Sequence, residues 1–284
     1  MVDEVSQYIV KYVHMYDARN LAHVLYTWNM LGYVPSTEMW VRYCTCVSSA
    51  LVTQEWDPKL LTTLLWNFAM MSHWHEPEPE LVEDVMATLM ARIKRDASLE
   101  NSQGEANSWL RQLYQAEQLL ALIPDQPREK PLLVLPDALR ARSLEVWKAP
   151  SRTLTSHMQV RVSRTLERAG FVVENEARVG EGFVCDILVR QGGATAMAHD
   201  MVVEVDGPSH YARALTGPVI SNVTLTRRLW LHKLGVPALY VPYYAWPTFD
   251  VSAEDAYVAG VLAPRLSSFD SWSPAEEARL RVGA

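Results

Sequence analysis

The 284-residue sequence contains no run of 18 apolar residues, so no segment is predicted to span a membrane. It has only three cysteines, which cannot form a disulfide framework, and no Cys-x-x-Cys pair that would indicate a zinc site. We therefore expect ordinary buried thiols and no bound metal. The first residues are acidic and lack the arginine-rich character of an organellar presequence and the apolar stretch of a secretory signal. We expect that a presequence has been removed or that the true start is missing.

Acidic residues are unevenly distributed along the chain. Residues 1–130 hold 10 basic and 17 acidic residues, which accounts for the whole net charge of −7, whereas residues 131–284 hold 16 of each. No acidic residue occurs between Gly207 and Phe249. We expect the first half to repel phosphate, and the acid-free stretch to fold back as a cationic wall suited to polyanions.

The first half contains a repeat with a period of 40 residues. The second copy aligns apolar residues at helical spacing with those of the first, and each copy follows an aspartate that can cap a helix, Asp17 or Asp57. A third, weaker copy begins near Trp109. This period, with two helices per unit, predicts an α-solenoid over residues 1–123. The aligned pairs are Leu21 with Leu61, Leu25 with Leu65, Tyr26 with Trp66, Trp28 with Phe68, Met30 with Met70 and Leu31 with Met71.

These segments resemble octotricopeptide repeats and the related repeats of the FAST-kinase-domain family. The resemblance implies that the second helix of each pair faces RNA, which here offers Asn20, His23, Thr27, Thr62 and Thr63. The alternative is a helical scaffold that docks on protein. A proline-rich linker and a bridging helix are expected over residues 124–150.

The pattern changes after Ser156. A helix that ends at Gly170 precedes three strand-like runs, and a second helix, a strand and a final helix follow. This order predicts a small sheet flanked by helices, so the whole chain is expected to be an α+β protein of two domains.

One segment of the second half carries a motif of several parts. A strand ends in Glu-Val-Asp-Gly-Pro, and a Leu-x-Gly, a Thr-x-x-Arg-Arg helix and a Val-Pro-Tyr-x-x-Trp strand follow in order. This sequence resembles the RAP domain, which implies a RAP domain over residues 151–265, with its core motif at 201–249 and a tail at 266–284. The residues of the motif are Glu204, Asp206, Gly207, Pro208, His210, Tyr211, Leu215, Gly217, Thr224, Arg227, Arg228, Val241, Pro242, Tyr243 and Trp246.

The RAP domain is similar in fold to the PD-(D/E)xK endonucleases, and this similarity raises the question of catalysis. Such enzymes hold Mg²⁺ with carboxylates on adjacent strands and use a lysine to polarise water. Asp186, Glu204 and Asp206 are the candidate carboxylates, but an aspartate stands where the pattern requires lysine. The alternative is that Glu204 and Asp186 pair with Arg227 or Arg228, and we expect a site without catalysis.

Candidates for RNA contact are cationic or aromatic residues near the motif, because arginine and lysine bind phosphate and aromatic rings stack on bases. Trp230 is expected in the core and so, more often than not, is Trp246. The candidates are His210, Tyr211, Arg227, Arg228, Lys233, Arg161 and Arg164.

The resemblance implies an organellar RNA-binding protein. We expect a non-catalytic subunit that binds ribosomal RNA in association with the mitochondrial ribosome, or a factor for rRNA maturation or stability; a plastid is the alternative location. The acidic helical half is expected to bind ribosomal or other organellar proteins. The competing functions are a Mg²⁺-dependent endoribonuclease and an adaptor that binds only protein.

Overall fold

The computed structural model describes residues 2–95, 108–122, 131–149, 155–180, 182–190, 200–214, 217–247 and 250–268. The first part of the expected linker and most of the expected tail lie outside them. Two compact units are present: Met1–Ala149 with Ile220–Thr226, and Pro150–Val219 with Arg227–Ala284. No helix among the described residues has the length and apolar character needed to cross a bilayer.

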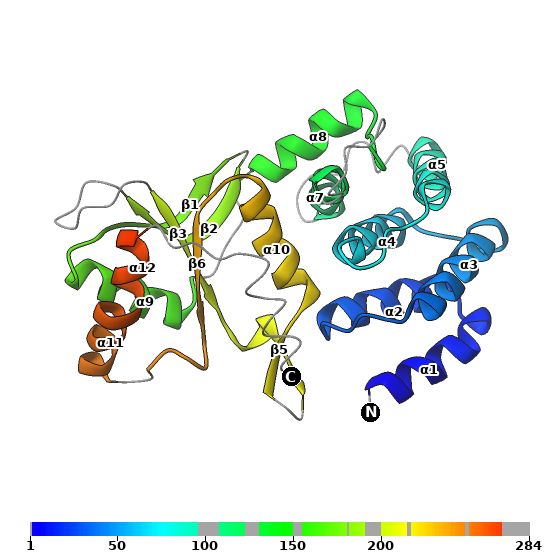
Figure 1. The fold of residues 1–284 in the computed structure, drawn as a ribbon. Coiled ribbons are helices and arrows are strands. Elements are labelled where there is room, and N and C mark those ends of the chain that lie inside the picture. Colours follow the sequence, from blue (N-terminus) through cyan, green and yellow to red (C-terminus); the bar gives the residue numbers. More distant parts are fainter. Residues whose placement is uncertain are drawn as a thin grey trace. The chain divides into compact units, whose positions relative to one another are not determined.

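The first unit is helical. Helix α4 packs against α2, α5 and α7; α3 packs against α5, and α7 against α8 (Figure 1). The bounds are α1 Val2–Tyr12, a 3-10 turn at Val13–Met15, α2 Ala18–Met30, α3 Thr37–Thr53, α4 Pro58–Met71, α5 Pro79–Arg95, α7 Ser108–Leu122 and α8 Asp137–Lys148.

The two aspartates of the repeat begin corresponding helices. Asp17 accepts a hydrogen bond from the backbone N–H of Asn20, and Asp57 accepts one from Leu60, each at 2.8 Å. The predicted helix caps are therefore confirmed. Thr62, expected on an RNA-facing surface, is instead fully buried and donates its hydroxyl to the Pro58 carbonyl, so that expectation is wrong.

The second unit contains a four-stranded mixed sheet in the order β1-β2-β3-β6. Neighbouring strands are antiparallel except β3 and β6, which are parallel and are joined through α10. A separate two-stranded sheet, β4-β5, was not expected from the sequence. The strands are β1 Val172–Val179, β2 Phe183–Arg190, β3 Met201–Asp206, β4 Tyr211–Ala214, β5 Gly217–Ile220 and β6 Ala238–Pro242.

The helices of this part cover both faces of the four-stranded sheet (Figure 1): α9, α11 and α12 lie on one side and α10 on the other. They span α9 His157–Arg168, α10 Asn222–Lys233, α11 Val251–Tyr257, a π-helical turn at Val258–Leu262 and α12 Ala263–Ser268, and a 3-10 turn at Pro208–His210 follows β3. The expected core positions of Trp230 and Trp246 are confirmed, because both are buried. The α+β class is also confirmed.

Alternation along β3 orients the motif. Val203 and Val205 lie in the apolar core formed with α9 and α12, so the intervening Glu204 and the terminal Asp206 face α10. All six residues of this strand are buried. A buried strand that carries two carboxylates requires partners for both of them, because an unpaired buried charge is costly.

Candidate functional site: a paired carboxylate cluster beside an aromatic corner

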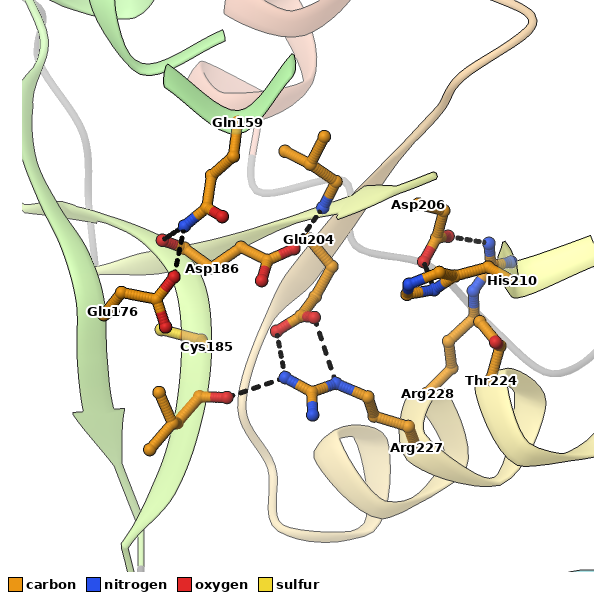
Figure 2. Close-up of polar contacts among 12 residues, drawn as sticks. Gln159, Glu176, Cys185, Asp186, Glu204, Asp206, His210, Thr224, Arg227 and Arg228 are labelled. Atoms are coloured by element: carbon orange, nitrogen blue, oxygen red, sulfur yellow. Dashed lines mark hydrogen bonds and ion pairs between the residues drawn. The ribbon is translucent and has the colours of Figure 1, made fainter. Parts of the chain in front are cut away.

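Arg227 is the partner of Glu204. Its Nε lies 3.0 Å from Glu204 Oε2 and its Nη2 lies 3.2 Å from Oε1, which is the two-pronged geometry that makes arginine–carboxylate pairs strong. Nη2 also donates to the Val184 carbonyl at 2.6 Å, and the guanidinium lies 4.4 Å from the centre of the Phe183 ring. The guanidinium thus has protein partners on several sides (Figure 2).

Asp206 has a basic side chain at each of its oxygens. Arg228 Nη2 lies 2.5 Å from Oδ2, and His210 Nδ1 lies 2.8 Å from Oδ1. Burial alone would raise the pKa of Asp206, but the neighbouring His210 and Arg228 outweigh it and hold that pKa below its ordinary value. Arg228 also lies over the Tyr240 ring, 4.2 Å from its centre.

Asp186 faces Glu204 from the neighbouring strand but has no arginine of its own in the contacts of this cluster. The β2–β3 ladder runs from Val189 paired with Met201 to Ile187 paired with Val203. Beyond it, Asp186 Oδ2 accepts the Val205 N–H at 2.7 Å, so the side chain replaces a ladder partner. Burial and the nearby Glu204 charge raise the pKa of Asp186 to about 7.

Two further polar residues of this cluster were not anticipated. Gln159 on α9 donates from Nε2 to the Asp186 carbonyl and to Glu176 Oε1, both at 2.8 Å. Glu176 has a φ of 54°, the only positive value at a non-glycine position among the described residues, and its charge adds to the rise in the Asp186 pKa. The sequence contains only a weak indication that Gln159 belongs to this cluster: it is a polar residue on the buried face of a strongly amphipathic helix.

The three motif carboxylates do not meet at a common point. Glu204 turns to Arg227, Asp206 turns to Arg228 and His210, and Asp186 turns to the β3 backbone. Within the described ranges, no group of three or more His, Cys, Asp or Glu side chains is placed to share a metal ion. The three candidate carboxylates therefore do not converge on one point, because Glu204 and Asp206 are each paired with an arginine of α10 and Asp186 accepts from the backbone.

The cationic wall expected from the acid-free stretch is wrong for Arg228, whose side chain is buried. Arg228 is only 6% exposed, and Arg227 is engaged by Glu204. Arg161 Nη2 lies 2.5 Å from Oε1 of the buried Glu254, and the same oxygen accepts the Trp246 indole N–H. Arg228 and Arg161 neutralise internal carboxylates and are largely buried, so we withdraw them as phosphate contacts. Arg227 is also paired with a carboxylate, but its side chain remains 38% exposed.

The other candidates remain at the surface, in different places. Arg164 is exposed on α9. Lys233 is exposed in the last turn of α10, which leads to the start of β6. It therefore lies at the amino end of the parallel strands, whereas His210 and Tyr211 lie at their carboxyl end. His210 is partly exposed in the turn after β3, and Tyr211 begins β4. The structure thus joins His210 and Tyr211 in one corner but does not bring Lys233 to it.

Three tyrosines meet at this corner, where the parallel strands β3 and β6 end. Ring centres of Tyr211 and Tyr243 are 5.7 Å apart, and Tyr244 lies 5.4 Å from each of them. Tyr244 is 57% exposed. Of these three tyrosines, only Tyr211 was predicted from the sequence as an RNA contact. The parallel pairing of β3 with β6 places Tyr243 and Tyr244 beside it. We call His210, Tyr211, Tyr243 and Tyr244 the aromatic corner.

Comparison with known proteins yields no relative, since neither a protein-family model nor a curated protein matches the chain.

Proposed function

We propose that this protein binds RNA through its second unit and does not cleave it. The observation that carries the proposal is the arrangement of the motif strand: Glu204 and Asp206 are each neutralised by an arginine of α10, directly beside an aromatic corner with one exposed ring. Neutralised carboxylates do not repel phosphate, and exposed aromatic rings are common contacts for RNA bases.

The same pairing argues against hydrolysis. Metal-dependent nucleases use free carboxylate oxygens as ligands, and they need a base or a metal to activate water. Here the Glu204 oxygens accept from Arg227, and a guanidinium at its normal pKa is a poor proton acceptor. This pairing of carboxylates with arginines supports binding of RNA and assigns none of the carboxylates a catalytic role.

At the level of fold, we propose a RAP domain with an endonuclease-like core in the second unit and an α-solenoid in the first. The motif residues lie on β3, α10 and β6 in the order that the RAP resemblance requires. In the first unit, α2, α4 and α7 pack in succession while α3 packs on α5, as expected for stacked helical pairs.

The proposed setting is the mitochondrion, with ribosomal RNA as the ligand and a ribosome-associated role. The acidic composition of residues 1–130 supports a protein partner for the helical unit, because a surface of that sign repels RNA. Sedimentation with mitochondrial ribosomal particles on a sucrose gradient tests this setting, and its absence from ribosomal fractions would argue for a free factor.

Binding of RNA is expected to depend steeply on salt. The affinity of the full chain for a fluorescent RNA, measured by anisotropy, should fall as salt rises from about 50 to 200 mM, because phosphate contacts release counterions. Arg164→Glu should weaken binding and reduce the slope of log K against log salt by about 1. Arg19→Glu, the same substitution at an exposed position of α2 in the helical unit, is the matched control. A flat salt response, or no RNA binding at low salt, would instead support the protein-binding adaptor.

No cleavage is expected when the chain is incubated with RNA and Mg²⁺. The control is Glu204→Gln, which removes the charge but keeps the shape of the side chain. Gel analysis of labelled RNA should show intact RNA with both proteins. Mg²⁺-dependent cleavage by the unaltered chain that disappears in Glu204→Gln would establish the nuclease and overturn the proposal.

A further inference from the structure

We infer that the RNA taken by this site is single-stranded, and that one unpaired base stacks on the ring of Tyr244; this inference rests on the RNA-binding function proposed above. The ring of Tyr244 lies at the end of the motif strand, is held by two neighbouring rings and is 57% exposed.

Tyr244 lies in the turn that follows β6, at the carboxyl end of the parallel pair. This turn is tied to the motif strand, because the backbone N–H of Tyr243 donates to the Asp206 carbonyl at 2.9 Å. Crevices at the carboxyl ends of parallel strands are a usual place for ligands. The tyrosine thus stands at the edge of the sheet where the motif strand ends.

The ring of Tyr244 is held by its neighbours. Its plane makes angles of 73° with Tyr211 and 82° with Tyr243, which are favourable edge-to-face contacts. Two such contacts fix the orientation of the ring before a ligand arrives, so little side-chain freedom is lost on binding. More than half of its surface nevertheless remains open to solvent.

Tyr211, which buttresses Tyr244, is in turn fixed by the buried ion pair. Its hydroxyl lies 3.4 Å from Arg228 Nη2 and 3.5 Å from Asp206 Oδ2. The contacts of the cluster therefore extend in steps from Asp206 through Arg228 and Tyr211 to the exposed ring. We assign Arg228 and Asp206 as positioning residues for the platform rather than as ligands of RNA.

An exposed tyrosine held in this way selects an unpaired base. Bases in a duplex are already stacked and present only their edges in the grooves, whereas a single strand can lay a base face on the ring. Stacking accepts all four bases, so the site should show little sequence preference. The neutralised Glu204 and Asp206 permit the adjoining phosphates to approach.

The test compares Tyr244→Ala, Tyr244→Phe and the matched control Tyr8→Ala in the full chain. Tyr8 is a similarly exposed tyrosine, at 64%, on α1 of the other unit. Affinities are measured for a single-stranded RNA and for a duplex of the same length. Tyr244→Ala should weaken single-strand binding by about 10-fold, within the range for loss of one stacked base, with little change for the duplex. Tyr244→Phe keeps the ring and should bind as the unaltered chain does, and so should Tyr8→Ala.

A second measurement separates stacking from a general structural effect. A single-stranded RNA that carries 2-aminopurine reports stacking by quenching of its fluorescence, and the quenching should be lost in Tyr244→Ala and kept in Tyr244→Phe. Single-strand binding that is unchanged in Tyr244→Ala, or a preference for the duplex, would overturn the inference and leave the RNA-binding function standing. Absence of any RNA binding by the unaltered chain would remove the proposed function itself.

Discussion

Arg228→Met is expected to lower the free energy of unfolding of the second unit by about 3–5 kcal/mol at neutral pH. The change leaves Asp206, 2% exposed, without its arginine in a buried strand, and removal of one partner from a buried pair is among the costliest of substitutions. Native-state hydrogen exchange at the amides of β3 measures this unit separately from the helical one.

The matched control for Arg228→Met is the double variant Asp206→Asn with Arg228→Met. It removes both charges, and replacement of a buried pair by neutral groups of similar volume is often close to neutral. The double variant should therefore recover much of the loss. A single variant as stable as the unaltered chain, or a double variant less stable than the single one, would contradict the view that the charge on Asp206 is what Arg228 stabilises.

The same pair predicts how stability varies in acid. Because the pKa of folded Asp206 lies below its unfolded value, its contribution is fully present above the unfolded pKa, near 4, and is lost as pH falls through the folded one. Arg228→Met should therefore cost less in strong acid than at pH 7.

Asp186→Asn is expected to stabilise the second unit at pH 8 by about 1–3 kcal/mol. The pKa of Asp186 rises from 3.8 to about 7 on folding, so the folded state favours the protonated form. The cost of ionising it is absent below about pH 4, grows between about pH 4 and 7, and is constant above. The full shift would correspond to about 4 kcal/mol, and the partial exposure of Asp186 reduces it. Asparagine keeps an oxygen that can accept the Val205 N–H.

Thermal unfolding of Asp186→Asn at pH 4 and at pH 8 tests whether the substitution stabilises the protein as expected. The variant should unfold at a higher temperature than the unaltered chain at pH 8, and the two should nearly coincide at pH 4. Asp84→Asn, the same change at an exposed position of α5, should have an effect within about 0.5 kcal/mol at both values. A variant that is destabilised at pH 8 would show that the charge on Asp186 is required.

Features set by neighbouring residues were predictable. Asp17 and Asp57 begin helices because their side chains reach N–H groups three residues on, and Ser156 begins α9 in the same way. The strand character of β3 follows from its run of valines. From the sequence, the carboxylates of the motif could bind a metal ion or pair with Arg227 and Arg228. No rule based on neighbouring residues decides between these two alternatives.

The sequence by itself determined the α+β class, the main helix starts and the alternation that sends Glu204 and Asp206 to one face of β3, because each depends on residues within a turn or a strand. The tertiary structure alone decided that Arg227 and Arg228 meet those carboxylates, that Gln159 joins Glu176 to the Asp186 carbonyl, and that Tyr243 and Tyr244 join Tyr211. The contacts of Asp206 with Arg228 and of Glu204 with Arg227 join residues 22 and 23 positions apart and follow from the packing of α10 on the sheet. The tyrosine contacts follow from the parallel pairing of β3 with β6. Packing of that kind depends on the whole unit and leaves no periodic trace in the sequence.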